Sequence, residues 1–140
     1  MVLFSHFFLA LAQANQARIS KAFATFGRMV GIARRNDDSA SLAKVHNSIG
    51  WIYRELEAID LSLAENQKGL LIARKAGVQE AEINSMINLG WDQALAQSFR
   101  ESHRNFDRVE ALLMRDDWLR WRFEMRLEAC LLYTSDAADE

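Results

Sequence analysis

Proline is absent from this chain of 140 residues. No X-Pro turn therefore punctuates the sequence. The chain is instead rich in Ala, Leu, Arg, Glu and Gln, which lose little side-chain freedom in a helix. These two features together predict an all-α protein.

Cysteine and excess charge are also scarce. Cys130 is the single cysteine, which excludes an intrachain disulfide framework and a multi-cysteine metal site and favours a reducing cytoplasm. The 17 basic and 19 acidic residues give a formal net charge of −2, so no general attraction to nucleic acid or anionic membrane is expected. Half of the residues are apolar, which is enough for a folded core.

An apolar run from residue 2 to residue 12 opens the chain and is followed by Ala12-Gln13-Ala14, the pattern of a signal-peptidase site. A cleaved secretory leader at 1–14 is one interpretation. We favour a helix of the repeat described next, because no Lys or Arg precedes the run. The run is also too short, at ~11 residues, to span a bilayer.

An internal repeat with a period of about 40 residues is the main feature of the sequence. Ile32-Ala33-Arg34 recurs as Ile72-Ala73-Arg74, and Gly50-Trp51 recurs as Gly90-Trp91 at the same offset. A fixed period of this size is typical of a helical solenoid, in which each unit buries its apolar face by stacking on its neighbours.

Each unit is predicted to contain two helices, because apolar residues recur at three- and four-residue spacing. In the second unit, one face of the first helix has Leu42, Val45, Ile49, Ile52 or Tyr53, and Leu56. In the third unit, one face of the first helix has Ile83, Met86, Ile87, Gly90 and Ala94, and one face of the second has Phe99, His103, Phe106, Val109 and Leu113. Gly77 is expected to end the helix that runs from about Asp60 to Ala76.

Helix starts are predicted from short polar side chains. Asp37-Asp38-Ser39 and Asp116-Asp117 are expected to begin the helices that follow them. Ser98 with Glu101 has the spacing of a capping box.

Gly50 and Gly90 occupy equivalent mid-helix positions, where glycine costs about 0.5–1 kcal/mol relative to alanine. We interpret them as packing glycines at which a neighbouring helix passes closely. Here the chain resembles the tetratricopeptide repeat (TPR) family, whose helix pairs carry a large apolar residue, then a small one, then an aromatic three positions on. Ile49-Gly50 with Tyr53 matches this pattern, and Leu89-Gly90 matches its first two features.

The match has departures from the family pattern. Gln93 replaces the aromatic, and His46 and Met86 stand where the family favours tryptophan. The period of about 40 residues is also longer than the period of the family, which is about 34. Repeats of this longer kind are similar to those of bacterial multidomain signalling proteins. The resemblance covers residues 20–130 and implies an α-solenoid of antiparallel helix pairs.

We expect about seven helices in one domain, 1–132, with units at 1–36, 37–77 and 78–115 and a partial unit at 116–132. The helix from Trp118 is predicted to end at Leu131, with Trp118, Trp121 or Arg122, Met125 and Ala129 along one side. Residues 133–140 are expected to be a disordered or artefactual tail, because the ending is similar to translated sequencing-adapter DNA. The natural protein would then continue with more repeats.

A peptide-binding groove is predicted beside the two tryptophans, which in the resembled family face the concave side. Tryptophan is enriched in binding hot spots, and amide and cationic side chains can hold a peptide backbone or carboxylate. The candidate groove residues are Lys44, Asn47, Trp51, Arg54, Asn84, Ile87, Asn88 and Trp91. For these residues a core position or a solvated surface remains the alternative.

Two other clusters are expected to be structural. Arg100, Arg104 and Arg108 form a stripe that we interpret as a solvated face. Trp118 and Trp121, with Arg122 and Arg126, form either an interface anchor or the packing surface for a further helix.

Catalysis is not expected. His6, His46 and His103 lie in different predicted helices and match no metal motif, and His103 is expected in the core. The six glycines are scattered, so no phosphate-binding loop is evident, and no Ser or Cys lies in a nucleophile elbow. We expect no cofactor.

The sequence therefore favours a cytoplasmic protein-interaction scaffold that is part of a larger protein. Its partner would be a protein or peptide, or further domains of the same full-length chain, with no nucleic acid and no membrane. A sensor segment of a bacterial signalling ATPase or cyclase is the alternative, and an RNA-binding helical repeat is a third.

Overall fold

Seven α-helices account for the part of the chain that the computed structural model describes, the backbone of residues 2–138 and the side chains of residues 3–135. No strand occurs within these residues, which confirms the expected all-α class. The helices are α1 (Val2–Asn15), α2 (Ile19–Arg35), α3 (Ser39–Glu55), α4 (Ile59–Ala76), α5 (Gln79–Leu95), α6 (Phe99–Leu113) and α7 (Asp117–Ala138).

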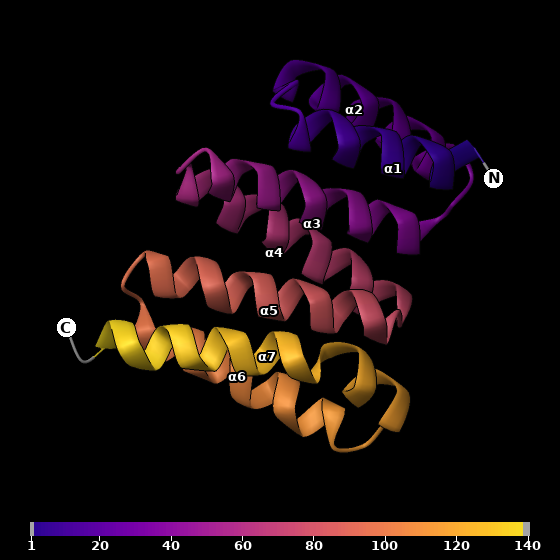
Figure 1. The fold of residues 1–140 in the computed structure, drawn as a ribbon. Coiled ribbons are helices and arrows are strands. Elements are labelled where there is room, and N and C mark those ends of the chain that lie inside the picture. Colours follow the sequence, from indigo (N-terminus) through magenta and orange to yellow (C-terminus); the bar gives the residue numbers. More distant parts are fainter. Residues whose placement is uncertain (1, 139–140) are drawn as a thin grey trace.

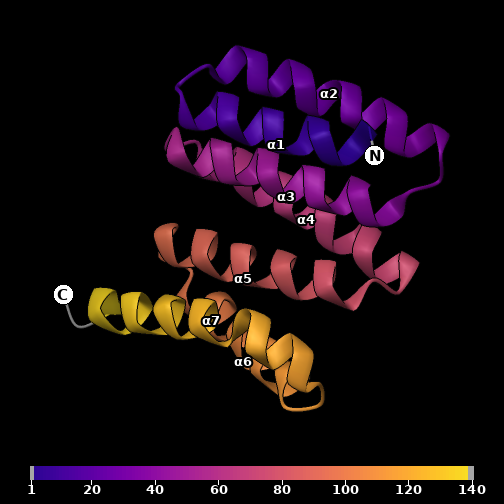
Figure 2. The ribbon, with the colours of Figure 1, turned by 45° about the vertical axis from the view of Figure 1, so that its right-hand side comes forward.

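Consecutive helices run antiparallel and stack into two layers (Figures 1 and 2). The odd-numbered helices α1, α3, α5 and α7 form one layer, and α2, α4 and α6 form the other. Each odd-numbered helix also contacts the next odd-numbered helix. The first helix pair, α1 and α2, and the last helix, α7, lie toward opposite ends of the stack. This arrangement is an α-solenoid of helix pairs, as the sequence repeat predicts.

A 20-residue register runs through the stack. Helices α2 to α6 begin at residues 19, 39, 59, 79 and 99, so two helices and two turns make one unit of the sequence repeat. The residues with positive φ after α1 to α5 keep the same spacing: Ala17, Asp37, Glu57, Gly77 and Gln97. After each of them, the next backbone N–H donates to a carbonyl five residues earlier at 2.8–2.9 Å, which is the Schellman helix ending.

The turn before α7 breaks this register. Met114 ends α6 in a right-handed conformation, and α7 begins at residue 117, where the register would place its start at residue 119. The helix then continues to Ala138, beyond the expected end at Leu131, so residues 133–138 of the expected tail are helical. Residues 139 and 140 of that tail lie outside the described residues.

Gly50 and Gly90 lie at close crossings within their helix pairs, as predicted. A Cβ on Gly90 would lie 2.5 Å from Cε1 of Phe106, and a Cβ on Gly50 would lie 2.7 Å from Nδ2 of Asn66. Phe106 and Asn66 are themselves separated by one full period of the repeat. The repeat therefore preserves a contact between two positions, although the side chains that make it differ.

Most of the predicted core is confirmed, with three exceptions. The first is Leu56, which is 50% exposed after the end of α3, and the second is His103. His103 is exposed, and its neighbour Ser102 is buried instead and donates to the Gly90 carbonyl at 2.7 Å. Ser98 precedes α6 but makes no capping bond. By contrast, Asp38 and Asp116 do cap their helices, accepting from the backbone N–H groups of Ser41 and Leu119.

The third exception is the buried face of α7, which is not the predicted one. Leu119, Phe123, Leu127 and Cys130 pack into the core, whereas the side chains of Trp118, Trp121 and Met125 are 60%, 72% and 83% exposed. Burial raises the pKa of the Cys130 thiol to about 11. Cys130 is thus a core residue of this fold.

The close crossing at Gly90 can be tested by replacing Gly90 with alanine. The added Cβ must displace the buried Phe106 ring, so the free energy of unfolding should fall by about 1–3 kcal/mol. The matched control is Gly27→Ala in α2, where an added Cβ would meet nothing within 4 Å. This substitution should raise the free energy of unfolding by about 0.5–1 kcal/mol, because alanine favours a helix more than glycine does. Urea unfolding measures both, and equal effects of the two substitutions would contradict the crossing.

The left-handed turns give a second test. Gln97 has a φ of 60°, which is unfavourable for a residue with a Cβ. We expect Gln97→Gly to raise the free energy of unfolding by about 0.5–1 kcal/mol, and Gly77→Ala to lower it by about 1 kcal/mol. Thermal and urea unfolding of the two variants check this, and destabilisation by Gln97→Gly would show that the turn does not hold this conformation.

Candidate binding groove

The face formed by α1, α3, α5 and α7 carries a chain of hollows that share their lining residues. One hollow of about 280 Å³ lies between Trp51 and Trp91. A second hollow shares Trp51 and Asn88 with it, a third shares Ser48 with the second, and a fourth, of about 260 Å³, shares Lys44 with the third. We call this row of adjoining hollows the groove.

The 20-residue register explains why these side chains meet. Equivalent positions of successive odd-numbered helices face the groove. From α1 to α3 and from α3 to α5 these positions are one full period of the repeat apart in sequence. From α5 to α7 they are two residues closer, because the turn before α7 is shorter. From α1 come Phe4, Phe8 and Leu11, and from α3 come Lys44, Ser48 and Trp51. From α5 come Asn84, Asn88 and Trp91, and from α7 come Arg122, Arg126 and Ala129.

All eight predicted groove residues line these hollows. The structure brings together Lys44, Asn47, Trp51, Arg54, Asn84, Ile87, Asn88 and Trp91. Three of them, Asn47, Ile87 and Asn88, are buried and form the floor. Lys44 is exposed at one end.

The two tryptophans are half-buried, between the core and the groove. Trp91 stacks on Tyr133 of α7, with ring centroids 4.8 Å apart and an interplanar angle of 13°. The guanidinium of Arg54 lies 5.9 Å from the centroid of Trp91, a cation–π distance. These contacts fix the orientation of the indole at the groove surface.

A buried carboxylate that the sequence reasoning missed lies under the groove. Asp92 has no exposed surface. Its two oxygens accept from Ser62 Oγ at 2.6 Å, Asn66 Nδ2 at 2.8 Å and Arg54 Nη1 at 3.0 Å. Burial raises the pKa of the Asp92 carboxyl, while the Ser62 hydrogen bond and the Arg54 charge oppose that rise.

The hydrogen bonds continue from Asp92 to the groove surface. Asn88 Nδ2 donates to Asn66 Oδ1 at 3.1 Å. Arg126 of α7 in turn donates to the side-chain oxygens of Asn88 and Asn84. This network therefore links α3, α4, α5 and α7 through polar side chains.

A second polar contact joins α3 to α5. Ser85 Oγ donates to Asn47 Oδ1 at 3.0 Å, while Asn47 Nδ2 has no partner among the described residues. Gly69 of α4 faces this side chain, because a Cβ there would lie 2.5 Å from Asn47 Oδ1. Two asparagine–glycine contacts, Asn47 with Gly69 and Asn66 with Gly50, thus hold α3 against α4.

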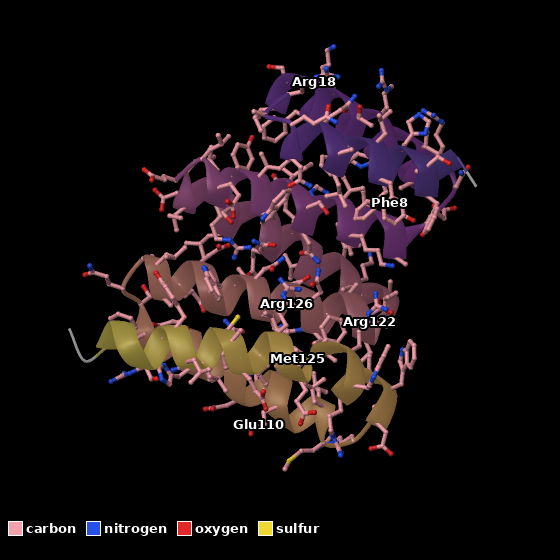
Figure 3. All side chains as sticks on the ribbon, viewed as in Figure 1. Phe8, Arg18, Glu110, Arg122, Met125 and Arg126 are labelled. Atoms are coloured by element: carbon pink, nitrogen blue, oxygen red, sulfur yellow. The ribbon has the colours of Figure 1, made fainter. Side chains whose placement is uncertain are left out.

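Arg122 and Arg126 are among the groove residues that were not predicted from the sequence. We grouped them with Trp118 and Trp121, but the structure separates the pairs. The arginines reach the groove, whereas both indoles lie on the exposed face of α7 and stack on each other at 5.1 Å. Figure 3 shows Arg122 and Arg126 on the side of the molecule that also carries Phe8.

The other charged clusters lie away from the groove. Arg100, Arg104 and Arg108 are exposed on α6, beside the exposed Glu101 and Asp107. His46 Nδ1 lies 2.7 Å from Glu65 Oε2 and joins α3 to α4. Among the described residues, no three His, Cys, Asp or Glu side chains gather closely enough to hold a metal ion.

Comparison of the chain with protein-family models, with curated proteins and with solved structures finds no match. None of the helices between residues 2 and 138 combines the length and apolar character needed to cross a membrane.

The raised pKa of Asp92 predicts a pH dependence. Between its ordinary value of 3.8 and the raised value, the folded protein holds a proton that the unfolded chain has lost, so stability falls as pH rises through this window. Asp92→Asn removes this effect. Urea unfolding from about pH 3.5 to 7 should show the stability difference, parent minus variant, decreasing with pH and then levelling. A difference that increases with pH would contradict the raised pKa.

Proposed function

We propose that this chain is a protein-interaction module that holds a peptide or helix in the groove and performs no catalysis of its own. The partner is a segment of another protein or a further domain of the same full-length chain. The observation that carries the proposal is the groove, a row of adjoining hollows in which side chains from four separate helices meet at equivalent positions of the repeat.

The groove has the chemistry that polypeptide binding requires. Trp51 and Trp91 offer aromatic surface that costs little conformational entropy to use. Asn84, Ser48 and Lys44 add amide, hydroxyl and ammonium groups that can hydrogen-bond to a peptide backbone or a carboxylate. Apolar contacts surrounded by a few fixed polar groups are typical of helix and peptide grooves.

The mechanism is passive. Two apolar clusters, one among α1, α2 and α3 and one among α4, α5, α6 and α7, hold the helices in place, and the Asp92 network joins α3, α4, α5 and α7. Because the groove side chains are set by this packing, a ligand meets a surface that is already organised, and binding loses less conformational entropy. The resemblance to tetratricopeptide repeats, which places Trp51 and Trp91 on the concave side, supports the same function.

Selection from a displayed library of random peptides, each of about 16 residues, tests the proposal. The affinity of selected peptides should fall by about tenfold or more in Trp51→Ala, because a central aromatic contact is lost. Trp121→Ala is the matched control, since that indole is 72% exposed and lies outside the groove, and should leave the affinity unchanged. Circular dichroism checks that both variants fold.

The proposal fails if repeated selections yield no peptide whose binding depends on Trp51. It also fails if selected peptides respond to Trp121→Ala and not to Trp51→Ala, because the binding surface would then be the exposed face of α7.

A further inference from the structure

The groove changes in chemical character from one wall to the other. The three positions that face it are all apolar in α1, are mixed in α3 and α5, and include two arginines in α7. Figure 3 shows the extremes of this change, with Phe8 on α1 and Arg122 and Arg126 on α7. A ligand that spans the groove therefore meets hydrocarbon on one side and positive charge on the other.

The α1 wall is an exposed aromatic surface. Phe4 and Phe8 are 70% and 54% exposed, and their rings meet edge to face at 4.7 Å. With Phe7 they line the hollow of about 260 Å³ at this end of the groove. Exposed apolar groups gathered beside a hollow are typical of an interaction site. The register places Phe4 and Phe8 at the groove positions that Asn84 and Asn88 occupy in α5.

Among the residues that line the groove, four are cationic and two are acidic: Lys44, Arg54, Arg122 and Arg126 against Glu55 and Glu80. Lys44 and Arg122 border the same apolar hollow. Lys44 makes no ion pair within the described part of the chain, although its charge helps to lower the pKa of the Asp38 carboxyl. Arg122 pairs with Glu80 at 3.0 Å where both side chains are partly exposed, an interaction that water weakens. Arg126 hydrogen-bonds to the neutral amides of Asn84 and Asn88, and no described carboxylate pairs with it.

We propose that the groove selects an acidic amphipathic segment of its partner, with bulky apolar side chains against α1 and Asp or Glu side chains against Lys44, Arg122 and Arg126. This inference rests on the proposed function, since it names the chemistry of the ligand for the same groove. Apolar burial provides the contact at one wall, and charge-assisted hydrogen bonds orient the segment at the other.

Three labelled helical peptides of about 18 residues test the inference by fluorescence anisotropy. The first carries Phe and Leu along one face and Glu along the opposite face. The second replaces each Glu with Lys, and the third replaces each Phe and Leu with Ser. The first should bind at least about tenfold more tightly than either of the others, and its affinity should fall between about 50 and 300 mM salt.

Protein variants assign the two walls. The double variant Lys44→Gln/Arg122→Gln should reduce the preference for the Glu peptide over the Lys peptide by about tenfold or more. Phe4→Ala/Phe8→Ala should lower the affinity for the Glu peptide and leave the salt dependence of that affinity unchanged. The matched controls, Arg100→Gln/Arg104→Gln on α6 and Leu61→Ala/Leu71→Ala on α4, change exposed residues outside the groove and should change neither property.

The inference is overturned if the Lys peptide binds as tightly as the Glu peptide, or if the control variants change binding as much as the groove variants. It is also overturned if no acidic amphipathic peptide binds while library selection yields peptides that depend on Trp51; the proposed function would then stand with a different ligand chemistry. A library that yields no groove binder at all rejects the proposed function itself.

Discussion

The 20-residue register is the constraint on which the rest of this structure depends. Five successive helices end in a left-handed residue followed by the same backbone hydrogen bond. Each following helix therefore begins with the same rotation about its own axis relative to the helix before it. Equivalent side chains of α1, α3 and α5 therefore face one surface. A single extra residue would rotate the following helix by about 100° and turn its groove residues elsewhere. The groove is thus a consequence of turn geometry repeated along the chain.

The middle of the stack is held differently from its two ends. At equivalent positions, the outer pairs use Phe26 and Phe106 and the central pair uses Asn66, whose amide bonds to Asp92. A buried carboxylate is costly to desolvate, but it becomes favourable to retain once several donors surround it, and removing one partner leaves a strong penalty. The donors of Ser62, Asn66 and Arg54 can meet Asp92 only when α3, α4 and α5 keep one alignment. The same network reaches Arg126 and so connects the core to the groove wall.

Much of the fold could be predicted from sequence because the repeat is direct evidence of equivalent environments. The offset between Gly50 and Gly90 predicted the close crossings, and helical spacing from Trp51 and Trp91 predicted residues that do line one groove. Asp92 was not predicted, because the equivalent residue one period earlier is the apolar Ile52. A charged residue at the position of an apolar one was the feature of the sequence that could have indicated it. The buried faces of α6 and α7 were predicted wrongly at His103 and Trp118, where the neighbouring residues Ser102 and Leu119 are buried instead. Adjacent side-chain rows on a helix are offset by a single residue, so helical spacing alone does not separate them. In α7 the shortened turn shifts the register by two residues, so Arg122 and Arg126 reach the groove.

The central claim is that this register decides which side chains face the core and which face solvent. Hydroxyl-radical footprinting with mass spectrometry measures that directly, because oxidation of Met, Phe and Trp side chains depends on their exposure. Met125, Trp121 and Phe4 should be oxidised rapidly, whereas Met86, Phe26 and Phe106, each at most 1% exposed, should be protected until the protein unfolds. Oxidation of Met86 and Phe106 in the folded protein at rates similar to those of Met125 and Phe4 would contradict the account.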